Sequence, residues 1–135
     1  MRYASRTKVP ISKSRLEIES ILSRYKADQF GTAMAKDKAM VQFRLNNWMV
    51  RFVLPLPSLN EQEQRQRWRA LALTIKAKLE AVESKITSFE VEFLPYLVMP
   101  SGSTFGEWAV PQLKDLREQG KIPDMNLLED RHKEH

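Results

Sequence analysis

Residues 61–86 read EQEQRQRWRALALTIKAKLEAVESKI, a run of strong helix formers with neither glycine nor proline. With a helical rotation of about 100° per residue, the large apolar side chains of this run fall on a single stripe. The stripe consists of Trp68, Leu71, Ile75, Leu79, Val82 and Ile86. This pattern predicts a long helix over 61–86 that packs its apolar stripe on a sheet.

A second line of small and apolar residues lies on nearly the opposite side of the same helix: Ala70, Leu73, Ala77, Ala81 and Ser84. Small side chains allow the C-terminal helices or a second subunit to approach closely. Alanine is also a good helix former at solvent-exposed positions. The line therefore has two interpretations, a second packing surface or an ordinary solvent face.

Upstream of this helix, residues 30–57 alternate apolar and polar side chains and carry turn signals at Lys36-Asp37 and Asn46-Asn47. This predicts a three-stranded antiparallel meander. A two-residue turn at Asn46-Asn47 places six side chains on the core face as the cross-strand pairs Leu45/Trp48, Phe43/Val50 and Val41/Phe52. The opposite face then carries Met40, Gln42, Arg44, Met49, Arg51 and Val53.

Three capping boxes mark further helix starts, because a Ser or Thr side chain and a following Glu bond each other's backbone N–H groups. They are Ser14-Arg15-Leu16-Glu17, Thr87-Ser88-Phe89-Glu90 and Thr104-Phe105-Gly106-Glu107. The first predicts an amphipathic helix over about 14–27, and the others predict two short helices, the last ending at Gly120. The last helix carries Trp108, Leu113 and Leu116, and Pro111 is expected to kink it or to move its start later.

The predicted fold class is therefore α+β. The order is an N-terminal helix, a three-stranded antiparallel meander, a long helix packed on the sheet, and two short C-terminal helices. With 135 residues, the chain has the length of one domain. We assign residues 1–123 to a single α+β domain and 124–135 to a charged C-terminal tail.

The composition argues against several classes of chemistry. The chain has no cysteine, and its two histidines, His132 and His135, are near the C-terminus, so thiolate catalysis, Cys-based zinc binding and a buried His triad are excluded. Its four glycines form no phosphate-binding loop. We expect a non-enzymatic protein with no cofactor and no metal. No apolar run is long enough for a membrane span or a signal peptide, so we expect a soluble, cytoplasmic protein.

The net charge of +5 is unevenly distributed, with +7 in residues 1–60, +2 in 61–86 and −4 in 87–135. Clustered Lys and Arg side chains are what phosphate binding requires. The candidate nucleic-acid contacts are Arg44 and Arg51 on the outer sheet face, Arg65, Arg69 and Lys76 along one edge of the long helix, and Lys78 along its other edge. The same side chains could instead cover the rims of the apolar stripe with their charges in water. Trp48 and Trp68 could stack on bases, but their places in the apolar pattern favour core packing.

Several segments resemble a family of small uncharacterised proteins encoded by tailed bacteriophages and prophages. The resemblance covers most of residues 3–110 and rests on Tyr3-Ala4, Glu17-Ile18-Glu19, Arg51-Phe52-Val53-Leu54-Pro55-Leu56-Pro57, Arg65-Gln66-Arg67-Trp68-Arg69-Ala70-Leu71 and Pro100-Ser101-Gly102-Ser103-Thr104. It implies a phage protein in a bacterial host cell that serves DNA replication, recombination or packaging, or neutralises a host protein. It implies no site residues. Family members often carry a basic insertion before the long helix, and this chain lacks it.

Two functional hypotheses follow. The first is a phage accessory protein that binds nucleic acid through the basic helix edge and the outer sheet face, which requires the basic side chains to converge on one surface. The alternative is a protein-interaction module, an inhibitor or adaptor of a host or phage protein, that uses Met40, Met49 and the Ala-lined helix face and could self-associate. This alternative requires the small-residue face to be exposed in the monomer.

Overall fold

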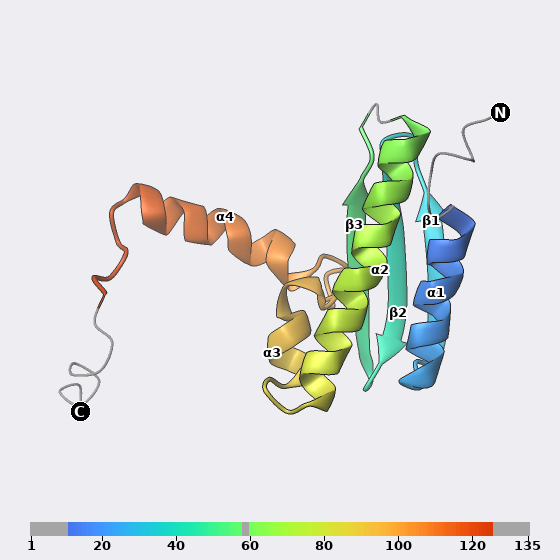
Figure 1. Cartoon of the computed structure of the whole chain (residues 1–135). Helices are drawn as coiled ribbons and strands as arrows, with labels where there is room; N and C mark the ends of the chain where they lie inside the picture. Colours follow the sequence, from blue (N-terminus) through green and yellow to red (C-terminus); the bar gives the residue numbers. More distant parts are fainter. Residues whose placement is uncertain (1–10, 58–59, 126–135) are drawn as a thin grey trace.

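The computed structural model describes residues 11–57 and 60–125 (Figure 1). The elements follow in the order α1 (Ile11–Arg24), β1 (Gln29–Met34), β2 (Lys38–Leu45), β3 (Trp48–Pro55), α2 (Glu61–Glu83), α3 (Phe89–Phe93), the 3-10 turn η2 (Leu94–Tyr96) and α4 (Phe105–Glu118). This is the predicted α+β order. The tail predicted over 124–135 lies largely outside the described residues.

The three strands form one antiparallel sheet in the order β1-β2-β3, as the alternating pattern predicts. Its register pairs Leu45 with Trp48, Phe43 with Val50, and Val41 with Phe52. Asn46 and Asn47 have φ angles of 55° and 64°, the left-handed conformation that a two-residue hairpin turn requires and that asparagine tolerates. The β1–β2 turn is closed by the Ala35 N–H, which donates to the Lys38 carbonyl at 2.8 Å, so the Lys36-Asp37 turn is also confirmed.

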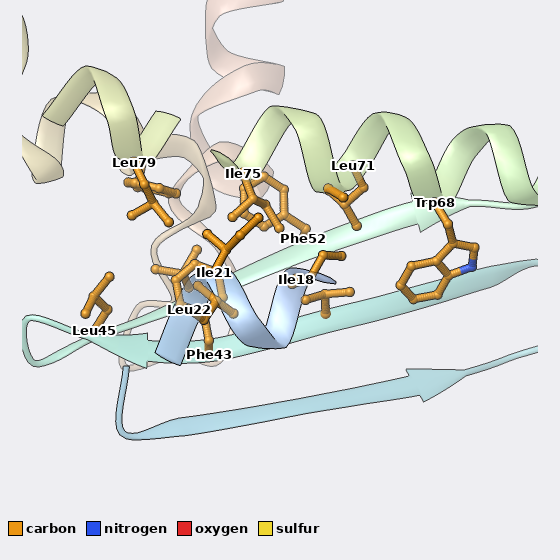
Figure 2. Close-up of a cluster of buried hydrophobic side chains, with 14 of the residues drawn as sticks. Ile18, Ile21, Leu22, Phe43, Leu45, Phe52, Trp68, Leu71, Ile75 and Leu79 are labelled. Carbon is orange, nitrogen blue, oxygen red and sulfur yellow. The ribbon is translucent and has the colours of Figure 1, made fainter. Parts of the chain in front are cut away.

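Helices α1 and α2 lie side by side on one face of this sheet (Figure 1). The core lies between the helices and the sheet, as Figure 2 shows for ten labelled side chains: Ile18, Ile21, Leu22, Phe43, Leu45, Phe52, Trp68, Leu71, Ile75 and Leu79. The α2 stripe is confirmed from Trp68 to Leu79, where every large apolar member is buried. The other face of the sheet is called the outer sheet face below, and none of the described helices covers it.

Aromatic side chains from α3 and η2 close one side of the core. The Phe93 ring packs edge-on against Phe43 and Phe52, with centroid separations of 6.2 and 6.4 Å. The Tyr96 ring stacks on Phe52 at 4.2 Å. Edge-to-face and offset aromatic pairs add to the gain from burial, so α3 and η2 belong to the same folded unit as the sheet.

The predicted start of the first helix is wrong. Helix α1 begins at Ile11, which packs against the core, so Ser14 lies inside the helix and is fully buried instead of capping it. The helix ends at Arg24 because Lys26 adopts a left-handed φ of 71°, which allows the Ala27 N–H to donate to the Leu22 carbonyl.

The end of α2 also differs from the prediction. The helix stops at Glu83, and Lys85 turns the chain with a φ of 69°. Ile86 is therefore outside the stripe and 79% exposed. The α2 N-terminus is fixed by an Asn60/Glu63 capping box that the sequence analysis did not identify.

The second predicted capping box is wrong by one residue. Ser88, and not Thr87, caps α3 by accepting from the Val91 N–H. The Glu90 carboxylate instead accepts from the Trp48 indole N–H at 3.0 Å. Trp48 is 38% exposed, so it lies at the border of the core.

The third capping box is confirmed at the start of α4, where Thr104 and Glu107 bond each other's backbone N–H groups. Gly120 follows the helix with a φ of 74°, as predicted. Pro111 lies inside α4 and does not move its start. None of the α4 residues is buried, and the helix projects away from the sheet and from α2 (Figure 1).

Candidate functional site

The base of α4 is attached firmly to the body of the protein. The Phe105 N–H donates to the Leu97 carbonyl at 2.9 Å, and Val98 bridges to Thr104. Gly106 lies so close to η2 that an added Cβ would be 2.9 Å from the Pro95 carbonyl oxygen. These contacts direct α4 away from the sheet of its own chain.

One side of α4 is mainly apolar, interrupted by Gln112. We call its apolar residues the α4 stripe: Phe105, Trp108, Ala109, Leu113 and Leu116. With a rotation of about 100° per residue, these positions fall within roughly 140° of arc. Trp108 is 54%, Leu113 62% and Leu116 42% exposed. Phe105 packs against Trp108, with ring centroids 5.5 Å apart. The N-terminal end of the stripe therefore has an aromatic contact within the helix, whereas Leu113 and Leu116 at its C-terminal end are exposed.

The outer part of α4 has little support of its own. An isolated helix of this length is marginal in water. Pro111 lacks a backbone N–H and costs about 3 kcal/mol relative to alanine inside a helix. Residues 112–118 make no packing contact with the body that buries them. A covering surface is therefore what would stabilise this part of the helix.

The outer sheet face is the second uncovered surface, and it mixes apolar with polar side chains. Its cross-strand rows are Gln29/Arg44/Met49, Gly31/Gln42/Arg51 and Ala33/Met40/Val53. Because Gly31 has no side chain, a hollow of about 340 Å³ opens beside it, with Ala33, Met40 and Met49 among its lining residues.

Arg51 lies flat across the outer sheet face. Its Nε donates to the Gln42 side-chain oxygen at 3.0 Å, and its Nη1 donates to the Gly102 carbonyl at 2.8 Å. Two of its donor groups are therefore engaged within the chain. The guanidinium ties the loop before α4 to the sheet.

The candidate nucleic-acid contacts do not come together on one surface. Arg44 and Arg51 lie on the outer sheet face, whereas Arg65, Arg69, Lys76 and Lys78 lie on α2, which packs on the opposite face. A single duplex or strand lying on one face would not meet both groups.

Most of these basic side chains also have acidic partners. Arg69 is 2.6 Å from Glu17 of α1, Arg65 is 3.5 Å from Glu61, and Arg44 is 3.9 Å from Asp28. Lys78 contacts both the carboxylate and the carbonyl of Glu92. Among the described residues Lys76 has no such partner. These pairs reduce the positive potential that phosphate groups would meet.

A further polar contact joins α1 to α2 at their C-terminal ends. The Tyr25 hydroxyl donates to the Glu83 carboxylate at 2.8 Å. This hydrogen bond, together with the negative charge of Glu83, raises the pKa of Tyr25. The contact holds the two helices in register and leaves the tyrosine neutral in the physiological range.

The small-residue face of α2 is not covered by the helices that follow it. Ala70, Leu73, Ala77 and Ser84 are exposed, and Ala81 is half-buried. The exposure that the protein-interaction hypothesis requires is therefore present. Small exposed residues are also common on an ordinary solvent-facing side of a helix. This face alone therefore identifies no binding site.

The three tryptophans have different environments. Trp68 is fully buried, which excludes base stacking. Trp48 is held through its indole by Glu90. Trp108 is the most exposed of the three. Its position in the sequence predicts a helix but does not reveal that nothing in the described part of the chain covers its side chain.

Within residues 11–57 and 60–125, no cluster of three or more His, Cys, Asp or Glu side chains could hold a metal ion. None of the helices described combines the length and the apolar character needed to cross a bilayer. No family model matches the chain, and no curated protein or solved structure matches it significantly.

Proposed function

We propose that this protein is a protein-interaction module whose contact element is α4. The observation that carries this proposal is the α4 stripe, which is exposed on a helix projecting from a firmly attached base. A contiguous exposed patch of large apolar side chains, rimmed by charges, is typical of a protein interface. Trp108 would be its anchor, because buried tryptophans contribute disproportionately to binding.

The resemblance to proteins of tailed phages and prophages supports a place for this module in the cytoplasm of a bacterial host cell. There, a host protein, a phage protein or a second copy of the chain could cover the stripe. The module would act as an inhibitor or adaptor, which requires binding and no catalysis.

Nucleic-acid binding is the second candidate, and one observation favours it. Lys36 and Lys38 lie in and beside the β1–β2 turn. In this turn the Asp37 carbonyl accepts a hydrogen bond from the Leu56 N–H. Next to it, Arg67 of α2 donates to the Pro55 carbonyl at 2.7 Å. Basic side chains from the sheet and from α2 therefore share one end of the molecule. The acidic partners of Arg65 and Arg69 weigh against this candidate.

Photo-cross-linking from α4 tests the proposed function. A photoreactive amino acid replaces Leu113 on the α4 stripe, and in a matched control it replaces Glu118 on the polar side of the same helix. In host cells we expect a discrete protein adduct from position 113 and little from position 118, because only the stripe would face a partner.

The size of the adduct separates the possibilities. An adduct of twice the chain mass identifies a second copy, and any other discrete protein mass identifies a different partner. Equal labelling from both positions, or none, would contradict the proposed function. A third probe at Lys76 tests the second candidate, since a nuclease-sensitive adduct from that position would support nucleic-acid binding.

A further inference from the structure

Two uncovered surfaces that carry apolar side chains differ in shape. The α4 stripe is a convex ridge with Trp108 along one edge and Leu113 along the other. The outer sheet face is broad, and the missing side chain at Gly31 leaves a hollow in it. A helix packed on each face of a sheet is a standard layered architecture, and here one of the two faces has no helix among the described elements.

The charges of the two surfaces are opposite where they would meet. The outward side chains of the sheet include Lys38, Arg44 and Arg51 and no carboxylate. On α4, Asp115 lies on the same side as Trp108, because seven residues make almost two complete turns. The Trp108 edge of the ridge is thus flanked by an acid, whereas Arg117 flanks the opposite edge beside Leu113. The acid at the Trp108 edge complements the bases around the hollow, which favours docking of that edge.

The two surfaces of one chain are directed apart. The close approach of Gly106 to Pro95, and the bond from the Phe105 N–H to Leu97, point α4 away from its own sheet (Figure 1). The α4 base is nevertheless next to the rim of the outer face, since the Val98 N–H donates to the Met49 carbonyl at 2.8 Å. A second molecule could therefore approach the outer face and α4 together.

We propose that α4 of one copy docks on the outer sheet face of a second copy, with Trp108 seated in the hollow beside Gly31. The docking is reciprocal, so a two-fold dimer covers both α4 stripes and both outer sheet faces and leaves neither surface open for further growth. Arg44 has 40% of its side chain exposed, lies 3.9 Å from Asp28 and donates to the Asn47 side-chain oxygen at 3.3 Å. It is the base placed to meet Asp115 of the second copy. This inference rests on the proposed function and adds the identity of the partner.

Filling the hollow is the sharpest test. A Cβ at Gly31 would meet no atom within 4 Å, and Gly31 does not have a positive φ. Gly31→Val is therefore compatible with β1, and a β-branched residue favours a strand more than glycine does. Compared as dilute monomers, we expect this variant to melt no lower than the parent protein. We expect it to dimerise at least about tenfold more weakly, because its side chain occupies the space for Trp108.

Sedimentation equilibrium of the purified full chain measures the dimer, with Trp108→Ala as a second disrupting variant. Leu73→Glu is the control, and it lies on the small-residue face of α2. If the dimer formed through that face, Leu73→Glu would abolish it and the Gly31 and Trp108 variants would not. We expect the parent and Leu73→Glu to dimerise and the Gly31 and Trp108 variants to be predominantly monomeric at the same concentration.

Three results would overturn the proposal. They are a parent protein that stays monomeric, a dimer that persists in Gly31→Val or Trp108→Ala, and a dimer that is lost in Leu73→Glu alone. A monomeric parent that still gives a protein adduct of another mass from position 113 would overturn only self-docking and would leave the proposed function standing.

Discussion

Replacing Leu113 and Leu116 together with glutamine is expected to weaken binding of the partner by at least about 100-fold. Each leucine contributes about 1.5–3 kcal/mol when it is fully buried, and in the free chain Leu113 is 62% and Leu116 42% exposed. Glutamine has a helix propensity close to that of leucine, so the helix itself is not penalised. The measurement is the dissociation constant of whichever complex the cross-link from position 113 identifies.

The matched control for this pair is Lys114→Gln with Glu118→Gln. It makes the same number of changes to glutamine on the polar side of α4 and leaves the net charge unchanged. We expect it to bind as the parent does, since rim charges contribute little affinity. Compared as unbound monomers, both variants should unfold at the parent's denaturant midpoint, because neither side of α4 is buried against the body. Equal loss of binding in the two variants would contradict a role for the stripe.

Trp68→Ala is expected to lower the free energy of unfolding by about 3–5 kcal/mol, the range for removing a large aromatic side chain from a core. Trp68 is fully buried between α2 and the sheet, and the Arg15 guanidinium lies over its ring at 5.9 Å. A loss of this size is a large part of the stability of a small domain. Equilibrium denaturation in urea measures it.

Trp68→Phe separates loss of packing from loss of the indole N–H. The Trp68 Nε1 atom has no hydrogen-bond partner among the described residues, so phenylalanine gives up no protein hydrogen bond and should cost only ~1 kcal/mol from the smaller ring. A cost for Trp68→Ala below about 1 kcal/mol would contradict the packing of α2 on the sheet.

The sheet and α2 could be predicted because local patterns and tertiary packing agree there. Asn46 and Asn47 can both adopt left-handed backbone conformations, so the hairpin turn fixes the register of β2 and β3. The apolar stripe of α2 packs on the core face of the sheet. Pattern and register together therefore determine which of these side chains enter the core.

The ends of the helices were harder to predict because several residues compete to be the cap. Ser14 fits a capping box by spacing, yet Ile11 gains contacts in the core and the helix begins before it. Thr87 and Ser88 are adjacent possible caps, and Glu90, the expected partner of Thr87, is engaged by Trp48. That contact is between residues distant in sequence, which spacing alone does not reveal.

The candidate site could be predicted only in part. The sequence predicts a short helix that carries Trp108, Leu113 and Leu116, but it does not indicate what covers these side chains. The close approach of Gly106 to Pro95, which sets the direction of α4, depends on the folded arrangement of η2. In the same way, the pairing of Arg69 with Glu17 joins residues far apart in the chain, so the basic edge of α2 carries less free charge than its sequence indicates.

Amide hydrogen exchange on the monomeric protein, and on the same protein with its partner bound, tests most directly whether α4 depends on being covered. We predict that amides of residues 112–118 exchange at nearly unfolded rates in the monomer and slow on binding, while those in the middle of α2 are protected in both states. Protection of α4 in the monomer equal to that of α2 would contradict this dependence, because the helix would then be stable without any covering surface.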